Sequence, residues 1–237
     1  MPISDPVIIS ASPAEEQPPP PDISAFTHTP CYCEENAYFL CKNLCRMGVT
    51  DEESRDLFVV FISNEDRRIP LWHQKASSRT DGLILWDYHV ICIQVKSHGR
   101  GNKLHQVWDL DTTLPFPVPL NQYIMEAVRP SLPLDPRFTR IFRVVHAPLF
   151  LRCFASDRRH MKDSDGHWMS PPPTYEPIIA EDGTLHNLEQ YIQMSAKDVV
   201  TNSGDLTNRI QMERFGVVMN EMQLEEFFYV QYDGHSS

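Results

Sequence analysis

Apolar side chains recur at helical spacing in the segment that follows residue 32. Five apolar positions fall three or four residues apart: Ala37, Leu40, Cys41, Leu44 and Cys45. Two glutamates precede this pattern, Arg46 closes it, and Gly48 follows as the residue type that most often ends a helix. The pattern predicts an amphipathic helix that begins at or next to Cys33 and ends before Gly48.

Several short runs further along the chain have the composition of buried strands. We expect strands over four segments, which are residues 57–63, 83–95, 105–111 and 141–146. Later helices are expected over residues 120–128, after a capping box formed by Asn187 and Gln190, and over 220–229. One helix followed by an antiparallel sheet and further helices predicts an α+β fold.

The first 27 residues differ in composition from the rest of the chain. Seven of the 20 prolines lie here, and no basic side chain balances the four acidic ones. Such a segment buries too little apolar surface to offset its ordering entropy. We therefore expect a disordered tail over 1–27 and a single domain over 28–237, because 41% hydrophobic residues suffice for a sizeable core.

The charge balance and the apolar pattern exclude several classes of protein. Acidic residues outnumber basic ones by 32 to 21, and the net charge of −11 disfavours binding to nucleic acid. No apolar run approaches the roughly 20 residues that span a bilayer, so we expect no membrane association. The absence of Lys or Arg before Lys42 argues against a secretory or mitochondrial leader. We expect a cytoplasmic or nuclear protein, in which thiols stay reduced.

Four of the six cysteines lie between Cys31 and Cys45, so this segment is the first candidate for thiol chemistry. Cys33 lies at the predicted helix start, where the positive end of the helix dipole stabilises a thiolate. The commoner alternative is a small, unreactive buried side chain. A zinc site is the third interpretation, although the spacing of His28 and the four cysteines differs from that of zinc knuckles.

A histidine and two aspartates flank the turn predicted over residues 97–102. If the hairpin is centred on Gly99, His89 and Asp109 are cross-strand partners with Cβ atoms about 4.5–5.5 Å apart. A carboxylate in that place holds an imidazole in one tautomer. A slip of one residue would move the two side chains to opposite faces. Asp111 shares a face with Asp109, so the spacing leaves the choice between the two aspartates open.

Cys33, His89 and Asp109 together supply a nucleophile, a base and an orienting acid. Their order along the chain agrees with papain-type and transglutaminase-type enzymes, in which a nucleophile at a helix N-terminus faces a sheet that presents the histidine. We therefore expect a papain/transglutaminase-like α+β domain. The alternative from the residues alone is a surface or half-buried His–Asp pair.

Longer blocks of sequence carry a resemblance to a known family. The blocks are CYCEEN at 31–36, VFISNE at 60–65, WDYHV at 86–90, WDLDT at 108–112, LPFP at 114–117, FASDR at 154–158, HMKD at 160–163 and residues 168–173. In these blocks the chain resembles the protein N-terminal glutamine amidohydrolase family, in the family's order from Cys31 to Met194. Six or more ordered blocks are much more specific than any single motif.

The resemblance implies a monomeric enzyme, without cofactor or metal, that deamidates an N-terminal glutamine to glutamate through a cysteine thioester. It assigns the triad to Cys33, His89 and Asp109 and so selects between the alternatives that the spacing left open. In the eukaryotic N-degron pathway this step prepares proteins for arginylation and degradation, and the downstream arginyl-transferase is an expected associate. Residues 199–216 look like an insertion before the final helix.

Selection of a terminal glutamine requires a group that binds the free α-ammonium, and a carboxylate suits this role. Glu35, in the first helical turn, is the first candidate, and Asp87, on the same strand face as His89, is the second. The alternative functions are a thiol protease or transglutaminase-like enzyme, and a non-catalytic metal-binding or adaptor protein.

Overall fold

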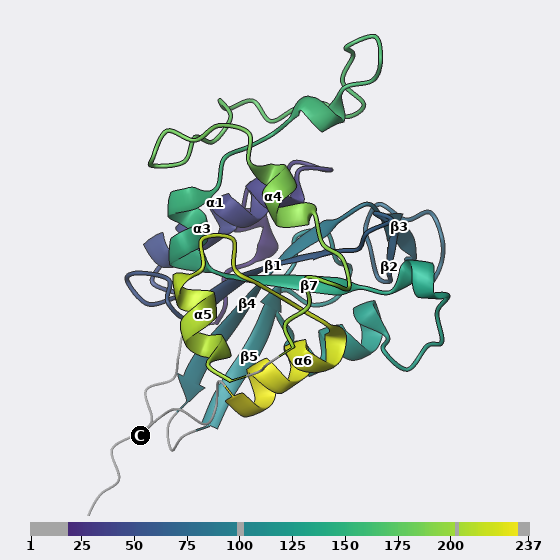
Figure 1. The fold of residues 1–237 in the computed structure, drawn as a ribbon. Coiled ribbons are helices and arrows are strands. Elements are labelled where there is room, and N and C mark those ends of the chain that lie inside the picture. Colours follow the sequence, from purple (N-terminus) through teal and green to yellow (C-terminus); the bar gives the residue numbers. More distant parts are fainter. Residues whose placement is uncertain (1–18, 99–101, 202–203, 232–237) are drawn as a thin grey trace, which may run out of the picture.

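The computed structural model describes residues 19–98, 102–201 and 204–231, and a six-stranded antiparallel sheet runs through their centre (Figure 1). Across this sheet the strand order is β6-β5-β4-β1-β7-β8, while β2 and β3 form a separate two-stranded sheet. The strands are β1 Leu57–Ser63, β2 Ile69–Leu71, β3 Ile84–Trp86, β4 His89–His98, β5 Asn102–Trp108, β6 Val118–Pro119, β7 Ile141–His146 and β8 Val217–Met219.

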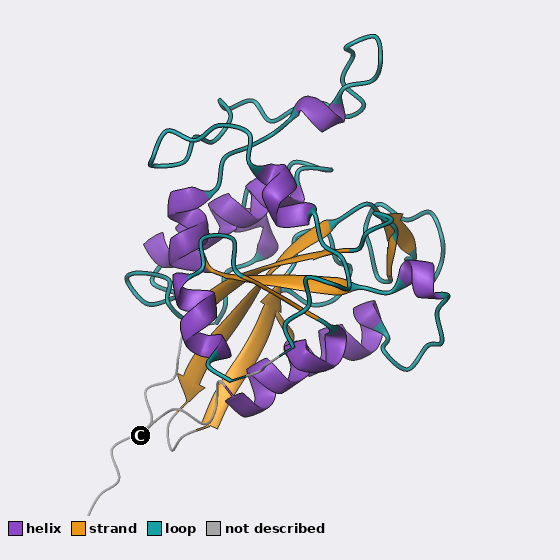
Figure 2. Ribbon diagram, viewed as in Figure 1, coloured by secondary structure: helices purple, strands orange, loops and turns teal. Residues whose placement is uncertain are grey.

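Helices lie on both faces of the large sheet, as Figure 2 shows by colour. The α-helices are α1 Cys33–Arg46, α2 Leu120–Tyr123, α3 Ala147–Cys153, α4 Leu188–Ile192, α5 Leu206–Met212 and α6 Glu221–Glu226. Shorter 3-10 and π turns are η1 Ile23–Ala25, η2 Ile124–Val128, η3 Pro136–Phe138, η4 Arg159–Met161 and η5 Phe227–Gln231. In the described part of the chain, no helix is long and apolar enough to cross a membrane.

The central strand β1 is apolar at almost every position because both faces of the sheet are covered. Leu57, Val59 and Phe61 pack into one core, which α1, α3 and α4 complete. The alternate side chains of β1 pack into a second core with α2, α5 and α6. These two layers of helix around an antiparallel sheet confirm the mixed helix and strand composition that the sequence predicted.

Helix α1 begins at Cys33 and ends at Arg46, as the apolar spacing predicted. Its C-terminus is closed by Gly48 at φ 68°, a left-handed conformation that glycine adopts without steric cost. The amide of Gly48 donates to the carbonyl of Cys45 and that of Val49 to Leu44, which satisfies the last helical carbonyls. The helix start that carries Cys33 is thus the end of a well-defined element.

Part of the segment predicted as a tail over 1–27 has local structure and packs on the domain. Ile23–Ala25 form a 3-10 turn that the side chain of Asp22 caps. Phe26 is buried, with its ring 5.5 Å from Phe116 and 6.4 Å from Trp108 (centroid distances). Burial of this aromatic ring stabilises the conformation of the residues around it. Residues 1–18 of the predicted tail lie outside the described residues.

Three local predictions differ from the structure. The strand expected over 105–111 is β5, which ends at Trp108. The strand expected over 83–95 is divided, because β3 pairs with β2 and only β4 joins the large sheet. Asn187 does precede a helix, but its side chain bonds the backbone of Ala155 and Cys153 instead of capping α4. The capping box found in the structure is that of Asn220, which opens α6.

Most of residues 199–216 form part of the fold. Helix α5 buries Leu206 and Ile210 in the second core, and the amide of Val200 bonds to the carbonyl of Val218. Gly216 closes the segment against β7, where an added Cβ would lie 2.1 Å from the carbonyl oxygen of Val144. A glycine is therefore required at this contact. Residues 202–203 lie outside the described residues.

Candidate active site

A cavity of about 180 Å³ opens at the N-terminal end of α1. Four parts of the chain form its walls: the start of α1, the link between β3 and β4, the turn after β5, and η4. The lining residues are Cys31, Cys33, Trp86, Asp87, Tyr88, Asp111, His160 and Met161. The cavity therefore contains the predicted nucleophile, one of the two predicted ammonium-binding carboxylates, and Asp111.

Cys33 is the first residue of α1 and is only 8% exposed. Its thiol lies 3.8 Å from Oε2 of Glu34 and can donate a hydrogen bond to it. Burial raises the pKa of the Cys33 thiol well above its ordinary range, and the nearby acids Glu34 and Asp111 raise it further. This direction is opposite to the lowered pKa expected for a cysteine at a helix N-terminus, and its causes are burial and the acidic neighbours.

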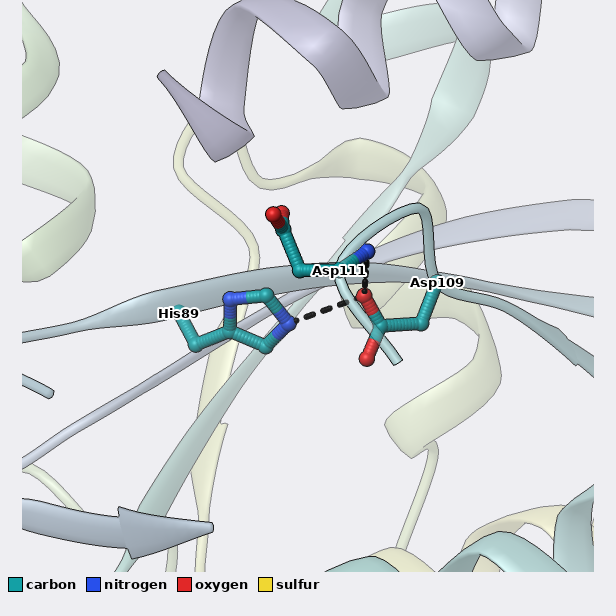
Figure 3. A group of neighbouring side chains, drawn as sticks. All are labelled: His89, Asp109 and Asp111. Carbon is teal, nitrogen blue, oxygen red and sulfur yellow. Dashed lines mark hydrogen bonds and ion pairs between the residues drawn. The ribbon is translucent and has the colours of Figure 1, made fainter. Parts of the chain in front are cut away.

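His89 and Asp109 form a fully buried pair (Figure 3), with Nε2 of the imidazole 3.1 Å from Oδ1 of the carboxylate. The same Oδ1 accepts the backbone N–H of Asp111 at 2.9 Å, and Oδ2 accepts the hydroxyl of Tyr123 at 2.8 Å. Burial favours the neutral imidazole, but the charge and hydrogen bond of Asp109 outweigh it and raise the pKa of His89. The pKa of Asp109 is lowered, since the attraction to His89 outweighs the effect of burial.

The hairpin brings His89 and Asp109 together in a register that differs from the predicted one. Cys92 pairs with Trp108, whereas a hairpin centred on Gly99 would pair it with Gln106. The observed shift is two residues, so each side chain keeps its predicted face. The last pair of the ladder is Cys92–Trp108, and Asp109 follows the end of β5. The predicted contact is present, although Asp109 reaches His89 from beyond the ladder.

The second ring nitrogen of His89, Nδ1, is buried and has no hydrogen-bond partner among the described residues. In Figure 3 this edge of the ring and the carboxylate of Asp111 point to the same side of the strands. Asp111 connects the two parts of the site, because it lies within 4.8 Å of the polar atoms of His89 and Asp109 and also lines the cavity of Cys33. Its Oδ1 lies 2.7 Å from Nε2 of His28.

The two carboxylates predicted to bind an ammonium group lie in different surroundings. Glu35 is fully buried, and its two oxygens bind Nε and Nη2 of Arg158 at 2.8 and 2.7 Å. Glu35 therefore differs from the expectation of a free carboxylate at the site, since a guanidinium already occupies it. Asp87 is exposed, lines the cavity, and has no ion-pair partner in the part of the chain that the structure describes.

Four polar side chains of the site were not predicted from the sequence: Glu34, Tyr88 and His160 near Cys33, and Tyr123 beside Asp109. Glu34 lies 2.8 Å from the hydroxyl of Tyr88, which in turn is 3.4 Å from Nε2 of His160. Glu34 follows the nucleophile directly, but adjacent helical positions point in different directions, so spacing gave no reason to choose it over Glu35. Tyr123 was missed because its helical spacing marks it as a core residue, which it also is.

Among the described residues, two groups could hold a metal ion. One is His89, Asp109 and Asp111, and the other is the exposed set Asp163, Asp165 and His167. Neither group contains a cysteine, so the structure does not assemble the zinc site considered from His28 and the cysteines. The sulfur atoms of Cys41 and Cys92 lie 3.6 Å apart in the core, which agrees with a packing role.

Comparison with known proteins bears on the whole domain. The profile of the family described as N-terminal glutamine amidase matches residues 28–228. A protein of Arabidopsis thaliana named protein N-terminal glutamine amidohydrolase is 54% identical over 208 residues, which are 87% of this chain and 93% of that protein. A Drosophila melanogaster protein of the same name is 44% identical over 176 residues, 74% of this chain and 82% of that protein. These matches confirm the resemblance seen in the sequence blocks, and the chain belongs to the N-terminal glutamine amidase family.

Proposed function

We propose that this protein hydrolyses the side-chain amide of an N-terminal glutamine to give glutamate and ammonia, with Cys33, His89 and Asp109 as the catalytic residues. The names of the relatives support the substrate, since they are called protein N-terminal glutamine amidohydrolases. The observation that carries the site is the buried His89–Asp109 pair with an open Nδ1, beside a cavity that holds Cys33 at a helix start.

In the first step, Sγ of Cys33 attacks the carboxamide carbon and its proton passes to Nδ1 of His89. The raised pKa of Cys33 means that the resting group is a thiol, so removal of the proton accompanies the attack. Asp109 holds the imidazole tautomer through Nε2 and stabilises the imidazolium that forms. The raised pKa of His89 makes it an effective proton acceptor.

In the second step, the imidazolium gives its proton to the leaving nitrogen and ammonia departs. A thioester between Cys33 and the glutamyl side chain remains. Water then attacks this thioester with His89 as the base, which releases the glutamate product and restores the thiol. The backbone N–H of Cys33, which lies in the first turn of α1, is a candidate donor to the oxyanion.

The free α-ammonium of the substrate distinguishes a terminal glutamine from an internal one. Asp87 is the better of the two predicted carboxylates for this role, because it lines the cavity and no cation occupies it among the described residues. Glu35 is excluded from the role in this proposal by its bidentate contact with Arg158.

The proposal also includes the fold type, oligomeric state, pathway, partner and cellular location of the protein. It comprises a papain/transglutaminase-like arrangement of the triad, a monomer that needs no cofactor, action in the N-degron pathway, association with an arginyl-transferase, and a cytosolic or nuclear location. The mixed fold, with Cys33 at a helix start against an antiparallel sheet, supports the first of these points.

The test is incubation of the protein with a peptide that begins with glutamine, scored by ammonia release and a mass gain of one dalton. An N-acetylated copy and a peptide with only internal glutamine should not react. Equal reaction of these copies, or incorporation of an added amine, would favour the protease or transglutaminase alternative. Cys33→Ala should lower turnover by about 10⁴-fold or more, as loss of a nucleophile does in other triads.

Cys31→Ala is the matched control, since Cys31 lines the same cavity but precedes α1. We expect it to retain most of the turnover. If Cys31→Ala abolished ammonia release and Cys33→Ala did not, the nucleophile would be the other cysteine. If neither did, the thioester mechanism would be wrong.

A further inference from the structure

Glu34 is a buried acid next to the candidate nucleophile, and the mechanism proposed above gives it no task. Its side chain has no exposed surface, and Oε2 lies 2.8 Å from the hydroxyl of Tyr88 and 3.8 Å from Sγ of Cys33. Its other oxygen, Oε1, is buried without a hydrogen-bond partner in the described part of the chain. A carboxylate in such a place is very costly, whereas a carboxylic acid is not.

The arginine near Glu34 is already paired with another carboxylate. The titratable or charged side chains that face it are Tyr32, Cys33, Glu35, Asp87, Tyr88, Arg158, His160 and Tyr175. Arg158 is held by both oxygens of Glu35. His160 donates from Nδ1 to the carbonyl oxygen of Asp157 at 2.8 Å, and its Nε2 lies 3.4 Å from the hydroxyl of Tyr88 rather than against Glu34.

Few donors reach the carboxyl group of Glu34. Among the described side chains, Oε2 accepts the hydroxyl of Tyr88 at 2.8 Å and faces the weakly donating thiol of Cys33 at 3.8 Å. Oε1 has no partner among the described residues, so an ionised Glu34 would keep one oxygen buried and unbonded. A proton on Glu34 removes the charge that this surrounding leaves uncompensated.

We propose that Glu34 is a neutral carboxylic acid in the active enzyme, that it accepts the hydroxyl of Tyr88, and that its ionisation sets the alkaline limit of turnover. The inference rests on the proposed function, in which Cys33 is the nucleophile. Glu34 acts here through Cys33 and does not touch the substrate. When it is neutral no charge lies beside the sulfur, and when it is ionised a negative charge lies there.

The titration of Glu34 agrees with this geometry. Burial raises its pKa from the ordinary value of 4.5 to about 8; the hydrogen bonds to Tyr88 and its own backbone oppose the rise, and the charges of Glu35 and Asp87 add to it. Below about pH 8 the acid is neutral, and above it a carboxylate lies beside Cys33. That negative charge opposes loss of the thiol proton and the developing oxyanion, so turnover falls as pH rises.

The same proton gives a readout that does not depend on activity. In the unfolded chain the glutamate ionises near its ordinary pKa, whereas the folded protein keeps the proton up to about pH 8. The folded state then binds more protons over this range, so its stability must fall as pH rises. Glu34→Gln removes this dependence, because the amide is neutral throughout and can still bond Tyr88.

The experiment compares melting temperatures of the full-length wild type, Glu34→Gln and the matched control Glu176→Gln from about pH 5 to 8. Glu176 is exposed, and its substitution makes the same chemical change. We expect the wild type to lose about 5 °C or more relative to Glu34→Gln across this range, and Glu176→Gln to follow the wild type. Parallel curves for the wild type and Glu34→Gln would overturn the neutral acid.

The second measurement is kcat against pH with a saturating Gln-initiated peptide, so that the free peptide's own amino group, with a pKa of about 7.7–8.0, does not shape the profile. Normalised to its own maximum, the alkaline limb of Glu34→Gln should move up by about one pH unit or more. An unmoved limb would overturn the control of turnover by Glu34.

The two measurements separate the inference from the function on which it rests. A wild type that releases no ammonia from the peptide overturns the proposed function and the alkaline limit together, while the melting curves still test the neutral acid. If Glu34→Gln does not fold, the carboxylic-acid carbonyl band of the wild type, followed by infrared spectroscopy as pH rises, replaces it. The absence of a buried carboxyl that titrates near pH 8 would then overturn the inference.

Discussion

Two buried ion pairs lie near the N-terminal end of α1, and the difference between them is the identity of the cation. The side chains of His89 and Asp109 are 0% and 1% exposed, and those of Glu35 and Arg158 are 0% and 9% exposed. In both pairs the carboxylate accepts charged or polar hydrogen bonds on both oxygens. Burial and pairing alone therefore do not distinguish them.

The cations differ in what they can do with a proton. A guanidinium stays charged at any physiological pH, so the Glu35–Arg158 pair can only hold the 154–187 connection against α1. An imidazole titrates near neutrality, and His89 keeps one buried nitrogen open. We conclude that the pair suited to catalysis is distinguished by a titratable histidine whose second ring nitrogen has no hydrogen-bond partner among the described residues. Burial alone does not distinguish it. Substitutions in each pair test this difference.

The largest effect is expected from Asp109→Asn, in the pair that contains the histidine. The neutral amide does not hold the imidazole in the required tautomer and does not stabilise its protonated form. We therefore expect kcat for a Gln-initiated peptide to fall by about 10³–10⁴-fold. Loss of the carboxylate also removes the interaction that raises the pKa of His89. The acid limb of kcat/KM, which requires the neutral base, should therefore move to lower pH.

Asp111→Asn is the matched control for this substitution, because Asp111 lies two residues further along and faces the same site. Its loss of turnover should be clearly smaller, since its carboxylate does not bond the imidazole. Equal losses, or a larger one from Asp111→Asn, would contradict the assignment of the orienting acid.

Arg158→Gln is expected to act on stability rather than on the chemical step. It leaves Glu35 buried without its cation, and loss of one partner of a buried pair costs about 3–5 kcal/mol of unfolding free energy. Urea denaturation at neutral pH measures this change. Turnover per folded molecule should fall less than tenfold. A fall in kcat that matches that of Asp109→Asn, with stability unchanged, would remove the distinction between the two pairs.

Arg137→Gln provides the surface reference for that experiment. Arg137 pairs with Asp135, and the two side chains are 67% and 44% exposed. Solvent screens such a pair, so the expected loss of unfolding free energy is much smaller than that of Arg158→Gln. If both arginine variants lost equally little stability, Glu35 would not depend on Arg158 for its burial.

The elements of the fold could be predicted from the sequence where local pattern decides them. The spacing of apolar residues gave the bounds of α1, and the apolar run of β1 gave a strand covered on both faces. The packing of residues before 28 could not be predicted in this way, because Phe26 contacts residues about 80 to 90 positions away. The prediction of a tail used the average composition of the segment, and a single buried aromatic residue changes that average very little.

The site was predictable as far as it follows from strand alternation. The parity of the hairpin placed His89 and Asp109 on one face, and the error of two residues in register left that parity intact. The fate of Glu35 could not be predicted, because its partner, Arg158, lies 123 residues further along the chain. The raised pKa of Cys33 was hidden for a similar reason, since it depends on burial by the assembled domain.

Asp87→Asn gives the smallest expected effect and tests what an unpaired carboxylate does beside the two pairs. If Asp87 binds the substrate's ammonium, its loss should raise KM for a Gln-initiated peptide about tenfold, because a hydrogen bond between charged groups contributes about 1.5 kcal/mol or more. The effect should stay near this lower bound, since Asp87 is exposed and solvent screens its charge. Steady-state kinetics should show the change in KM with kcat largely retained, because the carboxylate binds a part of the substrate that does not react.

Asp165→Asn makes the same change at an exposed loop position away from the cavity lining, and it should leave KM as it is. An unchanged KM in Asp87→Asn would mean that the ammonium is bound elsewhere, and Asp111, the other carboxylate of the cavity, would be the next residue to substitute.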